Sequence, residues 1–235
     1  MIYILLPAYN EERDLPALLE RIQPVIQSSA LDWHVIVVND GSRDRTGEIA
    51  RQYAEAMPLT ILDHGVNKGL GAAMLTGLEY VSRTARAEDI VVAMDADNTH
   101  DPALIEMMAA QIGAGSDVVI ASRYQKGGEE LGLSTVRKIL SRGASALLRF
   151  FFPIQGALDY TCGYRAYKAA VLQRAFRAFG PHFVTERGFT CMAEILIRLN
   201  QIGARVSEVP LILRYDFKSG PSKMKFARTI WRYML

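Results

Sequence analysis

The sequence predicts an α/β fold with a doubly wound, mostly parallel central sheet flanked by helices. Short apolar runs rich in Val and Ile recur at residues 2–6, 35–38, 59–62, 90–94 and 118–121. They do not alternate with polar residues, which is typical of strands buried on both faces of a parallel sheet. Amphipathic segments separate the runs, so the pattern alternates strand and helix. A chain of 235 residues is long enough for one such domain.

The helices expected between these strands cover residues 13–26, 44–56, 69–84 and 102–112. Two of them have recognisable starts. Asp44 and Thr46 precede the second helix, and Asp101 with Pro102 supplies an N-cap and a proline at the first helical position. Right-handed βαβ connections then follow from the order of the elements.

The second half of the chain has a less regular pattern. We expect a long helix with basic residues at intervals at 134–152, a helix at 188–201 and a strand at 205–213. Neither an internal repeat nor a low-complexity linker is visible. We therefore expect one domain over residues 1–221, followed by a basic amphipathic helix over residues 222–235.

Charge is distributed unevenly along the chain. The formal net charge is +2, which by itself predicts no nucleic-acid partner. Residues 214–235 carry six basic side chains and one acidic side chain, whereas the preceding 213 residues carry 21 basic and 24 acidic ones. The two cysteines are too few for a disulfide framework. We find neither a targeting signal nor an uncharged apolar run long enough to span a bilayer.

Two aspartates directly after the fourth apolar run form the sharpest motif. In an open α/β sheet, ligands bind outside the carboxyl ends of the strands. Asp95 and Asp97 are separated by one residue and point to the same side of an extended chain. Such a pair suits a divalent cation, Mg²⁺ or Mn²⁺, shared with substrate phosphates. Two solvated or capping acids in a turn would give the same pattern.

Two further strand ends carry candidate ligand contacts. Asp40 stands in an Asn-Asp-Gly-Ser turn, where it either contacts a ligand or only forms the turn. Lys68 precedes Gly69-Leu70-Gly71 at a helix start, which could receive a phosphate or only allow close packing. Neither the Rossmann nor the P-loop fingerprint occurs.

Taken in order, these motifs resemble glycosyltransferase family 2 with the GT-A fold, especially the dolichol-phosphate mannose synthases and related polyprenyl-phosphate sugar transferases. The matching pieces span nearly the whole chain. They are Leu6-Pro7-Ala8-Tyr9-Asn10-Glu11-Glu12, Asn39-Asp40-Gly41-Ser42, Asn67-Lys68-Gly69, Asp95-Ala96-Asp97, Ala121-Ser122-Arg123-Tyr124, Arg137 with Ser141, Asp159-Tyr160-Thr161-Cys162-Gly163-Tyr164-Arg165, Glu208-Val209-Pro210 and Gly220-Pro221-Ser222-Lys223-Met224.

The resemblance implies a nucleotide-sugar donor of the GDP-mannose or UDP-glucose type and a polyprenyl-phosphate acceptor. It assigns nucleotide-sugar binding to Pro7, Tyr9, Glu11, Asp40, Lys68 and Asp95. It assigns the divalent metal, Mg²⁺ or Mn²⁺, to Asp95 and Asp97. It assigns acceptor phosphate contacts to Arg123, Arg137, Ser141 and Lys223.

The expected reaction is single displacement with inversion, because the nucleophile must approach opposite the leaving diphosphate. A phosphate acceptor is already anionic and needs cations rather than a base. A sugar-hydroxyl acceptor would need a carboxylate base, for which Asp159 is the candidate. The D-x-D-x-T of residues 95–99 would also fit a haloacid dehalogenase-like phosphatase, and the same motifs would fit a non-catalytic nucleotide-sugar-binding module.

The last residues bear on where the enzyme acts. From residue 224 onward, an apolar helical face carries Phe226, Ala227, Ile230, Trp231 and Met234, and the opposite face carries Lys225, Arg228 and Arg232. A basic amphipathic helix with aromatic side chains favours an anionic membrane surface, although it could also pack on its own domain. We expect a peripheral protein on the cytoplasmic face of the membrane. The sequence indicates no oligomeric state.

Overall fold

The computed structural model describes residues 1–29 and 31–219. The first half has β1 (Ile2–Ala8), α1 (Leu15–Ser28), β2 (Trp33–Asn39), α2 (Thr46–Ala54), β3 (Leu59–Asp63), α3 (Leu70–Thr84), β4 (Ile90–Ala93), α4 (Leu104–Gly113) and β5 (Val118–Ser122). The second half has β6 (Glu129–Leu131), α5 (Thr135–Phe151), β7 (Arg165–Lys168), α6 (Ala169–Phe179), η1 (Gly180–Phe183), α7 (Cys191–Gln201), β8 (Val206–Pro210), β9 (Ile212–Arg214) and η2 (Tyr215–Phe217).

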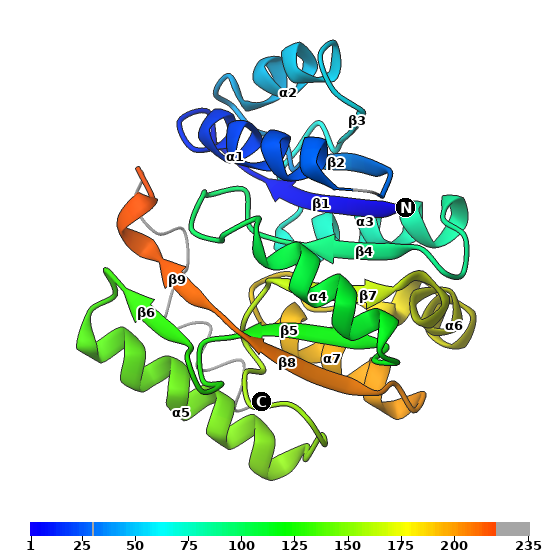
Figure 1. The fold of residues 1–235 in the computed structure, drawn as a ribbon, viewed down its shortest axis with the longest axis vertical. Helices are drawn as coiled ribbons and strands as arrows, with labels where there is room; N and C mark the ends of the chain where they lie inside the picture. The colour runs from blue at the N-terminus through cyan, green and yellow to red at the C-terminus, as the bar shows by residue number, and fades with distance from the viewer. Residues whose placement is uncertain (30, 220–235) are drawn as a thin grey trace.

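The central sheet of the described chain has seven strands in the order β3-β2-β1-β4-β7-β5-β8. Strand β7 runs against its neighbours β4 and β5, and the other pairings in this sheet are parallel. In Figure 1 α4 lies in front of this sheet, whereas α6 and α7 lie behind it. The prediction of a mostly parallel, helix-flanked sheet is therefore confirmed.

Burial explains why these segments form strands. Ile4, Leu5 and Leu6 of β1 are fully buried, as are the four consecutive residues 35–38 of β2. Continuous apolar runs of this kind belong to strands covered on both faces. The core therefore lies along the sheet, and the polar residues that follow β1, β2 and β4 gather at the carboxyl edge of these parallel strands.

The second half differs from the prediction in two places. The expected strand 205–213 is two strands, β8 in the large sheet and β9 in a small sheet with β6. Strand β7 and helix α6 were not predicted. The expected helix 222–235, including Lys223, lies outside the described residues.

Candidate active site

A cavity of about 290 Å³ opens at the carboxyl edge of the sheet. Its lining residues come mainly from the ends of β1, β2, β4 and β5, from α5, and from the segments 161–163, 189–192 and 213–218. Nine of the predicted site residues line it: Pro7, Tyr9, Glu11, Asp40, Asp95, Asp97, Arg123, Arg137 and Ser141. Lys68 and Asp159 are not among the lining residues, and Lys223 lies beyond the part of the chain that the structure describes.

Asp97 lies in a tight turn after β4 and already has a cationic partner. Its Oδ1 accepts hydrogen bonds from Thr99 N (3.3 Å) and Thr99 Oγ1 (2.6 Å). Its Oδ2 accepts one from Lys218 Nζ at 2.5 Å. Asn98, between Asp97 and Thr99 in the turn, has φ 61°, a left-handed conformation that Asn tolerates better than most residues. Burial opposes ionisation of Asp97, but the charge of Lys218 outweighs it and lowers the pKa.

Within the described part of the chain, Asp95 has no comparable cationic partner. Its burial, and then the charge of Asp97, raise its pKa to about 7. Its backbone N–H donates to His100 Nδ1 at 3.2 Å, and the His100 ring stacks on Tyr164 with centroids 4.9 Å apart. Burial lowers the pKa of His100 to about 4, so this imidazole is neutral at pH 7. The pair Asp95–Asp97 therefore carries more negative charge than its described surroundings balance.

That surplus of negative charge fits a divalent cation. Carboxylate oxygens are the hard ligands that Mg²⁺ and Mn²⁺ prefer. Within residues 1–29 and 31–219, no three His, Cys, Asp or Glu side chains converge into a metal site. A cation held by Asp95 and Asp97 would therefore take further ligands from elsewhere, and substrate phosphates are the usual source.

Asp40, after β2, organises the loop between β3 and α3. Its carboxylate accepts hydrogen bonds from Lys68 N (2.9 Å), Gly69 N (2.8 Å) and Asn67 Nδ2 (2.9 Å). His64 Nδ1 lies 2.7 Å from the same carboxylate. The turn after β2 thus fixes the loop before α3. Lys68 contributes its backbone to this arrangement.

A buried ion pair forms the wall near β5 and β7. Arg123 donates to both carboxylate oxygens of Asp159, through Nε and Nη2, each at 2.7 Å. Nη2 also donates to Thr161 Oγ1 at 2.7 Å. Asp159 is fully buried. Burial disfavours its charged form, but Arg123 outweighs this and lowers the pKa of Asp159. Arg123 reaches the cavity, with Asp159 behind it.

Sequence reasoning gave no role at the acidic pair to three residues that shape it: Lys218, His100 and Gly163. Lys218 comes from a segment 121 positions after Asp97, so no local motif links them. His100 follows the D-x-D by three positions but lacks any metal-ligand spacing. Gly163 is a third case, because a Cβ there would lie 3.3 Å from Asp95 Oδ1. Its only signal in the sequence was its place in the 159–165 motif.

The chain resembles known proteins along most of its length. Residues 3–176 match the family model described as Glycosyl transferase family 2. "Polyprenol monophosphomannose synthase" of Mycolicibacterium smegmatis is 33% identical over 94% of this chain and 80% of that protein. "Dolichol-phosphate mannosyltransferase" of Pyrococcus furiosus is 32% identical over 99% of this chain and 61% of that protein. "Undecaprenyl-phosphate mannosyltransferase" of Micrococcus luteus is 32% identical over 95% and 87%.

Solved structures with the same fold include glucosyl-3-phosphoglycerate synthase from Mycobacterium tuberculosis. Its complex with Mn²⁺, UDP and glucosyl-3-phosphoglycerate superposes with a TM-score of 0.69 at 20% identity, covering 100% of this chain and 78% of that one. The complex with Mg²⁺ and UDP gives 0.69 at 22% identity over the same shares of the two chains. These likenesses establish a common fold.

Proposed function

Since the chain belongs to glycosyltransferase family 2, we propose that it transfers a sugar from a nucleotide-diphosphate sugar to a polyprenyl phosphate, with inversion. Mannose from GDP-mannose is the first donor to test, because three relatives are named for mannosyl transfer. UDP-glucose is the second. Membership of this family replaces the phosphatase hypothesis.

The distribution of charge in the cavity supports two substrate-binding sides. The acidic lining residues are Glu11, Asp40, Asp95 and Asp97, which follow β1, β2 and β4. Arg123 and Arg137 come from the loop after β5 and from α5. We assign the first side to the donor, with Pro7, Tyr9, Glu11 and Asp40 at the nucleotide. The second side, with Arg123, Arg137 and Ser141, receives the acceptor phosphate.

Asp95 and Asp97 are the residues that would hold Mg²⁺ or Mn²⁺. The cation, when bound, offsets negative charge on the diphosphate leaving group. Lys218 adds a monovalent charge at the same place through its contact with Asp97. These groups act where negative charge develops as the sugar–phosphate bond breaks, which is where electrostatic stabilisation lowers a barrier.

The burial of Asp159 and its pairing with Arg123 are the observation that favours a phosphate acceptor over a hydroxyl acceptor. A hydroxyl acceptor needs a base within hydrogen-bonding reach. Asp159 is fully buried, and Arg123 occupies both of its oxygens. As a positioning residue it holds the guanidinium of Arg123 toward the cavity. A phosphate with a second pKa near 6 is largely dianionic at neutral pH and needs only such cations.

The test is an acceptor comparison with purified protein, Mn²⁺ or Mg²⁺ and labelled donor. We expect polyprenyl phosphate to become glycosylated and the matching polyprenol, which ends in a hydroxyl, to remain unmodified. Transfer to polyprenol or to a free sugar would replace the phosphate acceptor with the hydroxyl acceptor. Donor binding without transfer to any acceptor would indicate a nucleotide-sugar-binding module.

The domain division and the site of action complete the proposal. We place the catalytic domain in residues 1–221 and a membrane-surface helix in residues 222–235, with the enzyme peripheral on the cytoplasmic membrane face. Among the described residues, no helix combines the length and apolarity needed to cross a membrane. A lipid-phosphate acceptor resides in a membrane, so the proposed acceptor favours an enzyme that acts at a membrane surface.

A further inference from the structure

His64, directly after β3, links the end of β2 to helix α3 through its two ring nitrogens. Its side chain is only 5% exposed. Nδ1 donates to Asp40 Oδ1 at 2.7 Å, because an ionised carboxylate can only accept. Nε2 lies 2.9 Å from Thr76 Oγ1 of α3. A buried imidazole with both nitrogens engaged has one orientation, so it fixes the carboxylate that it meets.

The other hydrogen bonds of the Asp40 carboxylate all come from the loop before α3. Oδ1 also accepts from Lys68 N, and Oδ2 accepts from Gly69 N and Asn67 Nδ2. A carboxylate has room for about four hydrogen bonds, so these contacts and His64 fill it. Among the described residues, His64 is therefore the one donor to this carboxylate from outside residues 67–69.

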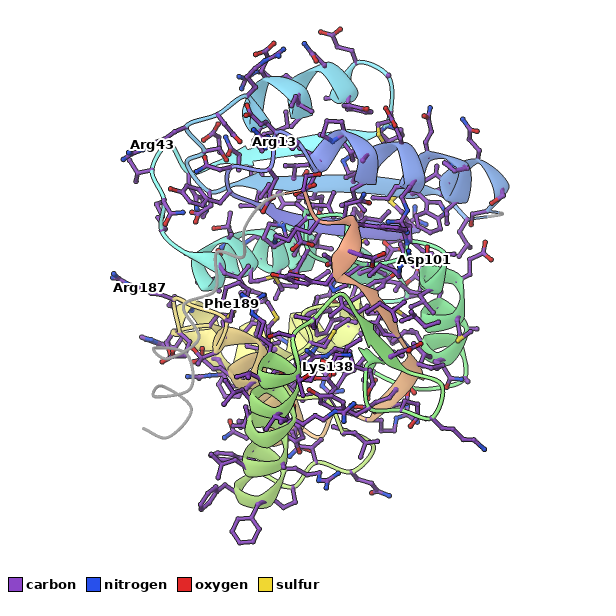
Figure 2. All side chains as sticks on the ribbon, turned by 90° about the vertical axis from the view of Figure 1, so that its left-hand side faces the viewer. Arg13, Arg43, Asp101, Lys138, Arg187 and Phe189 are labelled. Atoms are coloured by element: carbon purple, nitrogen blue, oxygen red, sulfur yellow. The ribbon has the colours of Figure 1, made fainter. Side chains whose placement is uncertain are left out.

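The loop before α3 is also packed closely on both sides. Gly41 has φ 65°, and a Cβ there would lie 2.3 Å from the carbonyl carbon of Val66. A Cβ on Gly69 would lie 2.5 Å from the carbonyl oxygen of Arg187. Figure 2 faces the edge at which β1 and β2 end, and it shows Arg43, from the turn after β2, on the same side of the view as Arg187. The loop is thus held between two backbone segments as well as by its carboxylate partner.

Asn67 connects this arrangement to the cavity, which it lines. Its Nδ2 donates to Asp40 Oδ2 at 2.9 Å and to the Asp40 carbonyl oxygen at 3.3 Å. The amide is therefore fixed with its nitrogen toward Asp40. No residue in the described part of the chain donates to Asn67 Oδ1, so this oxygen is left for a ligand. An amide oxygen only accepts, so its partner is an N–H or O–H group rather than a phosphate.

We propose that Asn67 Oδ1 accepts a hydrogen bond from the nucleoside of the donor, and that His64 is a positioning residue that orients this amide through Asp40. The inference rests on the proposed function, which places Asp40 at the nucleotide. A nucleoside offers two kinds of donor, an N–H of the base and the hydroxyls of the ribose. The sequence motif had assigned nucleotide binding to the neighbouring Lys68 instead.

The test uses the two amide side chains that each match one half of an imidazole. Asn places its amide nitrogen near the position of Nδ1, and Gln places its own near that of Nε2. His64→Asn therefore keeps the contact with Asp40, whereas His64→Gln keeps only the contact with Thr76. Titration calorimetry of the full chain with GDP and with UDP, in Mn²⁺, measures the effect. We expect a dissociation constant about tenfold higher for His64→Gln and within about twofold of the unmodified chain for His64→Asn.

The same difference should appear in turnover. His64→Gln should raise the KM for the nucleotide sugar and leave kcat and the KM for polyprenyl phosphate unchanged, because it weakens donor binding alone. The matched control is His34→Gln. His34 Nε2 also lies close to a threonine hydroxyl, that of Thr60 at 2.8 Å, but near the start of β2 and away from the cavity lining. This variant should bind nucleotide as the unmodified chain does.

Asn67→Ala tests the contact with the nucleoside itself. It should weaken nucleotide binding by a similar factor, and His64→Gln should add little in that background, since the two residues act as one unit. Asn67 is exposed, so this variant gives the measurement even if His64→Gln loosens the fold. With 2′,3′-dideoxy nucleotides, the effect of Asn67→Ala should vanish if a ribose hydroxyl is the donor and persist if a base N–H is.

Equal binding by His64→Gln and His64→Asn would overturn the inference, and so would a full effect of His64→Gln in the Asn67→Ala chain. Either result, with sugar transfer intact, would leave the proposed function standing. Nucleotide binding that follows the expected pattern, without transfer to any acceptor, would overturn the proposed reaction and support the inference. Failure of the unmodified chain to bind either nucleotide would overturn both.

Discussion

Two aspartates with nearly the same local structure differ in how completely positive charge balances their surroundings. Asp97 and Asp159 each accept hydrogen bonds at Oδ1 from the N–H and hydroxyl of the threonine two residues later. Arg123, held at the end of β5, neutralises Asp159 through both of its oxygens. Lys218 donates to Asp97 and is, among the described residues, the one lysine near both Asp97 and Asp95, and the pKa of Asp95 is raised. A buried acid with a complete partner supports the scaffold, whereas a half-exposed acid beside a buried one, with too little positive charge for both, is a place for a ligand.

Replacing Asp95 should have the largest effect on activity. We expect Asp95→Asn to lower the transfer rate by about 10²–10³-fold, the scale on which loss of one transition-state electrostatic contact acts. The fold should be retained, because the charge that is removed is poorly compensated. Initial rates at saturating donor and acceptor measure this. The matched control is Asp101→Asn, whose exposed carboxylate pairs with Arg21 outside the cavity. Equal losses in the two variants would contradict the assignment of Asp95.

Replacing Asp159 should have the largest effect on stability. We expect Asp159→Ala to cost about 3–5 kcal/mol in urea denaturation, because it leaves the Arg123 guanidinium buried without its partner. Adding Arg123→Met should recover part of the loss, since it removes the uncompensated charge. If the double variant were less stable than Asp159→Ala alone, the ion pair would not be the source of the effect.

The dependence of stability on pH should separate the two regions. The pKa of Asp95 rises from 3.8 to about 7 on folding, so its contribution is present at low pH and is lost as pH rises through that window. Asp159 has a lowered pKa, so its contribution is lost as pH falls below its ordinary range. Without divalent metal, Asp95→Asn should flatten the decline in stability between about pH 4 and pH 7. A decline of the same size in both proteins would refute this.

Replacing Thr99 or Thr161, the threonines that donate to Asp97 and Asp159, should have the smallest effects on stability. Thr99→Val removes one hydroxyl hydrogen bond to Asp97 and should cost about 1 kcal/mol. Thr161→Val also removes the acceptor of Arg123 Nη2 and should cost about 2 kcal/mol. Thermal unfolding measures both. The reverse order would mean that the hydroxyl at Asp97 supports the fold more than the one at Asp159.

Apolar runs made the first five strands and the acidic pair predictable. Asp95 and Asp97 follow a buried run, so their place at the sheet edge follows from the strand alone. Strand β7 has only four residues, Arg-Ala-Tyr-Lys, with a basic residue at each end. Arg165 is fully buried nonetheless, because the carbonyl oxygens of Met192 and Tyr160 accept its hydrogen bonds. These partners come from tertiary contacts that a local pattern does not contain.

Features of the cavity that follow from strand ends could be predicted, whereas those that depend on tertiary contacts could not. The residue types expected at the nucleotide and phosphates were found together because strand ends converge in any open sheet. The pairing of Arg123 with Asp159 depends on β5 and β7 being neighbours, and that of Lys218 with Asp97 on the path of the chain after β9. The exposure of Val136, Ile139 and Phe150 on α5 depends on which side of this helix the domain covers.

The antiparallel strand β7 also has a consequence for how the site assembles. Strands β4 and β5 are not hydrogen-bonded to each other, because residues 165–168 lie between them. In a chain folding from its N-terminus, Asp95 and Arg123 are both synthesised long before this gap can be filled. Pairings over such sequence separations form slowly. We expect the donor side, which follows β1, β2 and β4, to form first, and the acceptor side with Arg123 to join it only when β7 bridges β4 and β5.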